Sequence, residues 1–212
     1  MQATWRTQRG FTLIELLIAL AVGSLVMGAI YGVLVQQRNV YARHQQTLEM
    51  RQNVRLGLDV MSNDIRMAGF DPTGNAGAGI VTAQADLMRF TIDRNGSGTI
   101  GDAAFEDIAY RARAGSLRIQ SVRDKASGFQ AVVDTIQRLR FCYVLPSNDP
   151  QAPCLPEVTA GQLQNIRAVR LTLIAKASRR DPHYAENDGY RTLERVAVVQ
   201  FRNVALADEP GW

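Results

Sequence analysis

Asp93, Asn95 and Ser97 carry oxygen-bearing side chains at alternate positions of a short glycine-rich stretch. This is the spacing of the first ligands of a calcium-binding loop, in which a glycine follows at the sixth position and a hydrophobic residue at the eighth. Gly98 and Ile100 occupy those two positions. Because hard oxygen ligands suit a hard cation, the pattern indicates calcium rather than a softer metal.

The second half of this loop departs from the calcium pattern. The twelfth position, which normally carries a bidentate Glu, is Ala104. The backbone carbonyl of Thr99 stands at the seventh position, and Asp102, Glu106 and Asp107 follow closely enough to supply a late carboxylate. The sequence therefore predicts a weak calcium site and no other cofactor. The alternative is a plain glycine-rich turn between two strands.

Glu15 is a carboxylate at the edge of an apolar segment, because Leu16 to Val35 contain no charged side chain. As a helix, this segment roughly matches a ~30 Å hydrocarbon core. Arg6 and Arg9 precede it and favour the cytoplasmic side, so the remainder is expected outside the cytoplasm. An acidic residue within a membrane costs about 2.5 to 3.5 kcal/mol by insertion scales, which predicts a function for Glu15. The alternative is a signal anchor with a chance Glu.

Cys142 and Cys154 are the two cysteines of the chain, and they lie in the part expected to reach an oxidising compartment. A disulfide is the natural pairing there. The two histidines, His44 and His183, are not near the pair, which disfavours a zinc site. Closing this proline-rich loop is worth roughly 3 kcal/mol in the chain-entropy model.

The stretch Gly10-Phe11-Thr12-Leu13-Ile14-Glu15-Leu16 resembles the type III signal of type IV prepilins and pseudopilins. The resemblance implies that a membrane aspartyl peptidase cuts between Gly10 and Phe11 and methylates the new amine. It also implies a partner for Glu15, the amine of Phe11 on a neighbouring subunit. An acid and an amine attract strongly in a low-dielectric setting, so this pair would hold incoming subunits in axial register.

No proline interrupts the chain between Phe11 and Pro72, so one helix is expected from the signal to about Gly69. Its second half carries an apolar stripe at helical spacing that predicts packing against a sheet. The stripe comprises Val54, Leu58, Met61, Ile65 and Ala68. Residues 64–70 resemble the end of the long helix in PilW-type minor pilins, a family with the same prepilin start.

Seven later segments show the alternating pattern of short strands. They are residues 87–92, 107–113, 116–120, 129–133, 136–144, 166–175 and 193–202. The predicted fold is α+β and type IV pilin-like, with a long N-terminal helix packed on one C-terminal antiparallel β-sheet domain. The expected parts are a leader (1–10), a transmembrane half-helix (11–35), an amphipathic periplasmic half-helix (36–69) and a β-rich globular domain (70–212).

Arginines are spread over the expected strands and, alternating along them, predict a solvated face. They are Arg111, Arg113, Arg118, Arg123, Arg138, Arg140, Arg167, Arg170, Arg179 and Arg180. Clustered on one face they would bind DNA phosphates, but the formal net charge of +4 is not by itself a nucleic-acid signature. We find no nucleophile with a base and an orienting group, so the chain is not predicted to be an enzyme.

The resemblance implies a minor pilin that takes part in assembly, initiation or the tip of a type IV pilus, with roles in adhesion or twitching motility. The implied partners are other minor pilins, the major pilin, the prepilin peptidase, the inner-membrane assembly platform and a tip adhesin. The implied location is the inner membrane with a periplasmic domain, then the pilus surface. The alternatives are a type II secretion pseudopilin and a pilus-borne receptor for DNA or surfaces.

Overall fold

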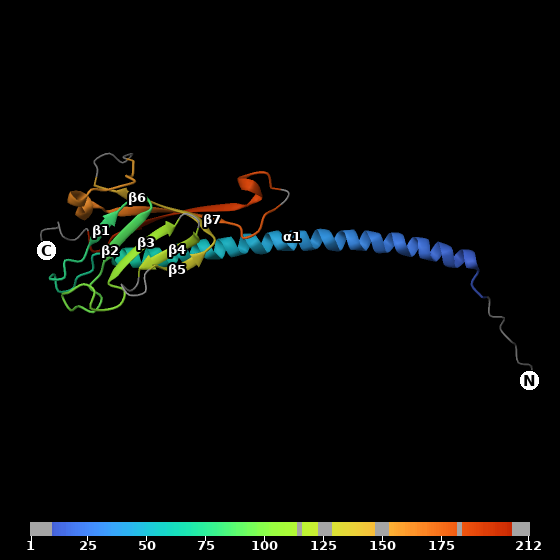
Figure 1. The fold of residues 1–212 in the computed structure, drawn as a ribbon, viewed down its shortest axis with the longest axis horizontal. Helices are drawn as coiled ribbons and strands as arrows, with labels where there is room; N and C mark the ends of the chain where they lie inside the picture. The colour runs from blue at the N-terminus through green and yellow to red at the C-terminus, as the bar shows by residue number, and fades with distance from the viewer. Residues whose placement is uncertain (1–9, 114–115, 123–128, 147–152, 182–183, 205–212) are drawn as a thin grey trace, which may run out of the picture. The chain divides into compact units, whose positions relative to one another are not determined.

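The computed structural model describes residues 10–113, 116–122, 129–146, 153–181 and 184–204. Over these residues the chain forms one long helix, α1 (Leu13–Met67), followed by strands and two short 3-10 helices (Figure 1). The later elements are β1 (Ile80–Ala83), β2 (Leu87–Thr91), β3 (Asp107–Arg113), β4 (Ser116–Val122), β5 (Phe129–Asp134), β6 (Ile136–Val144), η1 (Ala160–Asn165), β7 (Ala168–Lys176), η2 (Asn187–Gly189) and β8 (Thr192–Gln200).

The chain divides into two compact units, Met1–Gln45 and Gln46–Trp212, so α1 contributes to both. In the first unit α1 is long and apolar enough to cross a membrane, with a mean hydropathy of 2.4 over its most apolar window. The side chains of that window are not buried by any other part of the described chain. In the second unit α1 is part of the globular domain.

The end of α1 agrees with the predicted stop near Gly69. The helix ends at Met67, and Gly69 has a φ of +77°, a left-handed conformation that glycine adopts at little cost. The Gly69 N–H donates to the carbonyl of Thr91 at 3.0 Å, which joins the helix end to β2. A Cβ at Gly69 would lie 2.9 Å from Cγ2 of Val204, so the site also has no room for a side chain.

The predicted α+β fold is present, with a long helix and antiparallel strands, but the strands form two sheets rather than one, ordered β1-β2-β3-β4-β5 and β6-β7-β8. The break falls at Thr135, the one residue between β5 and β6, whose φ is +68°. Asn53 of α1 donates from Nδ2 to Oγ1 of Thr135 at 3.0 Å, and the Lys176 N–H donates to its carbonyl at 2.8 Å. The chain therefore passes from one sheet to the other at Thr135, which accepts hydrogen bonds from both α1 and β7.

The seven predicted strands are present as β2 to β8, with ends shifted by no more than a few residues. Sequence reasoning missed β1, which has four residues and directly follows the Gly- and Ala-rich stretch 73–79. It pairs antiparallel with β2, and its register shifts between Ile80 and Thr82. A strand of four residues that directly follows a loop-forming segment shows too little alternation of apolar and polar residues to be predicted.

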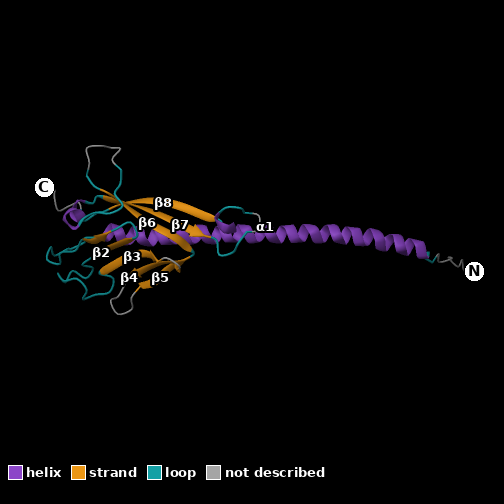
Figure 2. Ribbon diagram, turned by 45° about the horizontal axis from the view of Figure 1, so that its top comes forward, coloured by secondary structure: helices purple, strands orange, loops and turns teal. Residues whose placement is uncertain are grey.

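The hydrophobic core lies between the second part of α1 and the inner faces of both sheets (Figure 2). The predicted helical stripe is buried there, with Leu58 only partly so. The largest fully buried side chains come from both sheets and from α1, namely Tyr110, Tyr143, Phe90, Phe141, Met61, Ile65, Met88, Ile92, Ile108, Ile136 and Leu139. Tyr110 of β3 also donates its hydroxyl proton to Asp64 of α1, a polar link between helix and sheet.

Candidate functional site

The first turn of α1 is closed by Thr12 and Glu15. The Thr12 N–H and the Thr12 hydroxyl both donate to Oε2 of Glu15, each at 2.9 Å, and the Glu15 N–H lies 3.4 Å from Oγ1 of Thr12. The Thr12 carbonyl accepts the Leu16 N–H at 3.2 Å. This reciprocal arrangement is a capping box, which satisfies N–H groups that have no partner within a helix.

Sequence reasoning missed this partner of Glu15, although the spacing of Thr12 and Glu15 is the capping-box signature. Both residues are exposed, and Phe11, the predicted N-methylated residue, is 90 % exposed. Gly10 and Phe11 precede the helix in non-helical backbone, and Arg6 and Arg9 lie outside the described residues. The predicted contact of Glu15 with a neighbouring amine stays a prediction.

The first half of the predicted calcium loop is folded around Asp93. Oδ1 of Asp93 accepts the Ser97 N–H at 3.1 Å, and Oδ2 accepts the Gly98 N–H at 2.9 Å. The Ser97 N–H is shared with Oδ1 of Asn95 at 2.9 Å. Gly98 has a φ of +80°, so the sharp turn predicted at this glycine is present.

In the second half of the loop, Asp102 is linked to the first half and Glu106 holds the backbone that follows. Asp102 accepts from Asn95 Nδ2 at 3.3 Å and from the Thr99 hydroxyl at 3.1 Å. Oε2 of Glu106 accepts the backbone N–H groups of Gly101 (2.8 Å) and Ala103 (3.1 Å). Hydrogen bonding from Ser97, above all, lowers the pKa of Asp102 to about 2; Asn95, Glu106 and Thr99 act in the same direction and desolvation opposes them.

Asp107 pairs with Arg89 instead. Its two carboxylate oxygens accept hydrogen bonds from Nε (2.8 Å) and Nη2 (2.6 Å) of Arg89, which form a bidentate pair across β2 and β3. Among the described residues, no three His, Cys, Asp or Glu side chains are grouped closely enough to hold a metal. A cation here would therefore also need neutral oxygens, from Asn95, Ser97 or the backbone of Thr99.

The predicted disulfide between Cys142 and Cys154 is present, with the two Cα atoms 5.3 Å apart. Tyr143 and Leu155 exchange backbone hydrogen bonds of 2.7 and 2.8 Å beside it. The disulfide therefore joins the C-terminal end of this loop, at Cys154, to β6. Residues 147–152 of the loop lie outside the described residues.

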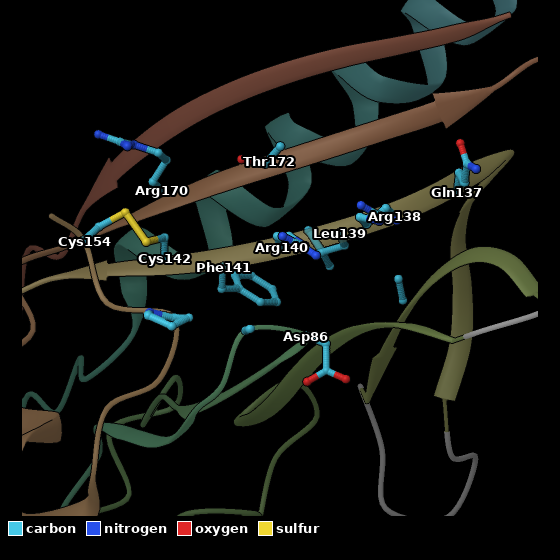
Figure 3. Close-up of a pocket in the computed structure, with 13 residues that line it drawn as sticks. Asp86, Gln137, Arg138, Leu139, Arg140, Phe141, Cys142, Cys154, Arg170 and Thr172 are labelled. Atoms are coloured by element: carbon cyan, nitrogen blue, oxygen red, sulfur yellow. A yellow bond between two sulfur atoms is a disulfide. The ribbon is translucent and has the colours of Figure 1, made fainter. Parts of the chain in front are cut away.

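A hollow of about 700 Å³ lies beside this disulfide, between β6 and the turn that carries Asp86 (Figure 3). Arg138 and Arg140 of β6 and Arg170 of β7 contribute exposed side chains to it. These three agree with the predicted solvated face. Arg111 does not, because it is half-buried with its guanidinium 4.3 Å from the ring centre of Phe129. Arg123 and the side chains of Arg113 and Arg118 lie outside what the structure describes.

Comparison with known proteins gives two family matches. Residues 5–31 match the prokaryotic N-terminal methylation motif, and residues 43–198 match prepilin peptidase-dependent protein B. No curated protein matches. Among solved structures, the type IV-like pilin TTHA1219 from Thermus thermophilus is similar at 15 % identity, over 73 % of this chain and 97 % of that chain, with a TM-score of 0.47.

Proposed function

Because this chain belongs to the prepilin peptidase-dependent protein B family, we propose that it is a minor pilin of the PilW type, which takes part in assembling a type IV pilus. The two family matches confirm the predicted resemblance to type IV prepilins. The observation that carries the proposal is the methylation motif, joined on one helix to an apolar segment and then to a packed β domain.

Processing is the first step of this proposal. The bond between Gly10 and Phe11 lies in non-helical backbone just before the capped turn of α1. A peptidase must bind its substrate with the scissile bond accessible, and, apart from Gly10 itself and its two chain neighbours, no described heavy atom lies within 4 Å of a Cβ built on Gly10. These features support cleavage after Gly10 by a prepilin peptidase and methylation of the Phe11 amine.

Membrane anchoring before assembly follows from the exposed apolar part of α1. Large hydrophobic side chains are exposed from Leu13 to Val35, where water would be an unfavourable solvent. Lipid would cover them in the inner membrane, and helices of other pilins would cover them in a filament. The globular domain would then lie in the periplasm and, after assembly, on the pilus surface.

The proposed partners follow from the same helix. Other minor pilins and the major pilin would pack against it, and Glu15 would pair with the amine of the neighbouring Phe11. In this account the chain acts by binding, in a complex that primes filament growth at the assembly platform and lies at the tip, where an adhesin joins it. No catalytic step is assigned to it.

Two other functions deserve a direct test. A type II secretion pseudopilin would share the same N-terminal motif. A pilus-borne receptor for DNA or surfaces is favoured by one observation, the three exposed arginines Arg138, Arg140 and Arg170 at one hollow. DNA binding through them would weaken steeply with salt, because phosphate contacts release counterions.

The experiment is a gene deletion scored for surface pili, twitching motility and protein secretion together, with complementation by the full chain. Loss of pili and twitching with intact secretion is the expected result. Loss of secretion alone would assign the chain to a secretion system instead. Unchanged pili, twitching and secretion would contradict the proposal.

A further inference from the structure

Two acidic side chains of the 93–107 loop, Asp93 and Glu106, are fully buried. In the part of the chain that the structure describes, no Lys, Arg or His forms an ion pair with Asp93, Asp102 or Glu106. Asp107, which follows Glu106 in the sequence, pairs with Arg89, but this ion pair does not include Asp93, Asp102 or Glu106. Burying an ionised carboxylate costs several kcal/mol unless a counter-charge compensates it. The loop therefore buries two carboxyl groups, and no basic side chain among the described residues pairs with them.

Glu106 carries a buried carboxylate oxygen that has no hydrogen-bond partner. Its Oε2 accepts two backbone N–H groups, but its Oε1 is buried and accepts no hydrogen bond. Buried carboxylate oxygens are normally satisfied, so an orphan of this kind requires an explanation. The Glu106 side chain also lies beside Asp102, which is linked in turn to Asn95.

Neutral oxygens of the same loop are available to a cation. Oδ1 of Asp93 and Oδ1 of Asn95 lie within hydrogen-bonding distance of one N–H, that of Ser97, so they are close to each other. The Nδ2 group of Asn95 donates to Asp102, which links the two halves of the loop. The donor set is entirely oxygen and mixes carboxylates with amide and backbone groups. Calcium accepts such sets, whereas magnesium demands a near-ideal octahedron.

We propose that the loop binds one calcium ion, with Glu106 in place of Asp107 as the carboxylate that completes the set begun by Asp93, Asn95 and Asp102. The exposed Asp102 side chain and the loop around it would close on the ion, since three carboxylates are not yet grouped. Affinity would be weak, on the order of 10⁻⁴ to 10⁻³ M, as in other extracellular modules. This site goes beyond the proposed function and does not depend on it.

The test uses the full chain in detergent micelles, titrated with calcium chloride by isothermal calorimetry and followed by thermal unfolding. One ion per chain should bind, and the melting temperature should rise with calcium, because a ligand of the folded state stabilises it by linkage. Magnesium chloride at equal concentration should raise it much less. No saturable binding and no thermal shift up to about 10 mM calcium would overturn the proposal.

Three variants separate the ligands from their neighbours. Glu106→Gln and Asp102→Asn should each weaken calcium binding by about tenfold or more and remove most of the thermal shift. Asp107→Asn, the matched control, breaks the pair with Arg89 and should leave calcium binding unchanged. If Glu106→Gln does not fold, the exposed position of Asp102 keeps the test decisive. Loss of binding in Asp107→Asn alone would refute the assignment, as would a melting temperature that responds to pH but never to calcium.

Discussion

Oε2 of Glu15 accepts both the N–H and the hydroxyl proton of Thr12 at 2.9 Å, so the carboxylate implied to bind a neighbouring subunit also caps its own helix. The two roles are compatible, because a carboxylate has two oxygens and several lone pairs. Capping fixes the side chain at the start of α1, beside Phe11. A carboxylate held there in advance loses less conformational freedom when it meets an incoming amine.

The first prediction separates the charge of Glu15 from its capping role. Glu15→Ala and Glu15→Gln should both insert into the membrane and be processed, yet be recovered in sheared filaments at much lower levels than the wild type. Gln at this position still completes a capping box, so its failure would identify the charge as the essential property. Quantitative mass spectrometry of filaments, normalised to the membrane fraction, is the measurement.

Thr12→Ala is the matched control for this experiment. It removes the cap, at a cost of about 1 kcal/mol to the first turn, but keeps the carboxylate. Incorporation should fall only modestly, and much less than in Glu15→Gln, because the charge is kept and only the preorganisation of the carboxylate is lost. Equal recovery of Glu15→Gln and wild type, with loss only in Thr12→Ala, would contradict the subunit-register role and leave Glu15 as a helix cap.

The second prediction concerns the disulfide between Cys142 and Cys154, which are 12 positions apart. Its removal in the double variant Cys142→Ser/Cys154→Ser should lower the free energy of unfolding by about 3 kcal/mol, because the unfolded chain regains loop entropy. A reductant should lower the melting temperature of the wild type and leave the double variant unaffected. Identical melting of oxidised and reduced wild type would show that the bond is not a structural tether.

The third prediction tests the polar link between α1 and β3. Tyr110 is fully buried and its hydroxyl bonds Asp64, so Tyr110→Phe leaves the carboxylate without that donor. The free energy of unfolding should fall by about 1 to 2 kcal/mol, measured by denaturant titration. Tyr41→Phe is the control, because Tyr41 is 72 % exposed and should change stability by less than about 0.5 kcal/mol. Equal stability of the two variants would mean that the link contributes nothing.

The fourth prediction concerns the turn after α1. Gly69→Ala combines a left-handed φ of +77° with a Cβ 2.9 Å from Val204 Cγ2, so it should cost about 1 to 2 kcal/mol or more. Gly79→Ala is the matched control, because that glycine has no positive φ and open space around its Cβ position. Comparable melting temperatures for the two variants would contradict the proposed packing of the helix end against Val204.

Periodicity predicted α1 and seven strands because both signals are local in sequence. The second sheet could not be predicted, because it is created at Thr135 by a positive φ that a β-branched residue rarely adopts. Asp134 just before it is a turn-forming residue, but a turn does not by itself indicate a change of sheet. The conformation of Thr135 depends on Asn53 and Lys176, which are distant in sequence and meet it only in the folded domain. A local pattern therefore gives the strands but not their division into sheets.

The candidate cation loop could also be predicted only in part from the sequence. The turn around Asp93, through Asn95 and Gly98, follows from residue spacing alone. The choice among late carboxylates does not, because Asp107 is taken by Arg89 only through the register of β2 against β3. The capping role of Glu15 could be predicted from its spacing to Thr12, whereas its partner on a neighbouring subunit is implied only by the resemblance to prepilins.

The most direct test of the central claim is the mass of the N-terminal peptide of this chain, measured in sheared and purified filaments. A pilin-type assembly component should be found in the filaments, beginning at Phe11 with one methyl group on its amine, and without residues 1–10. A chain that is absent from filaments, or present with its leader attached or cut near residue 36, would contradict the account.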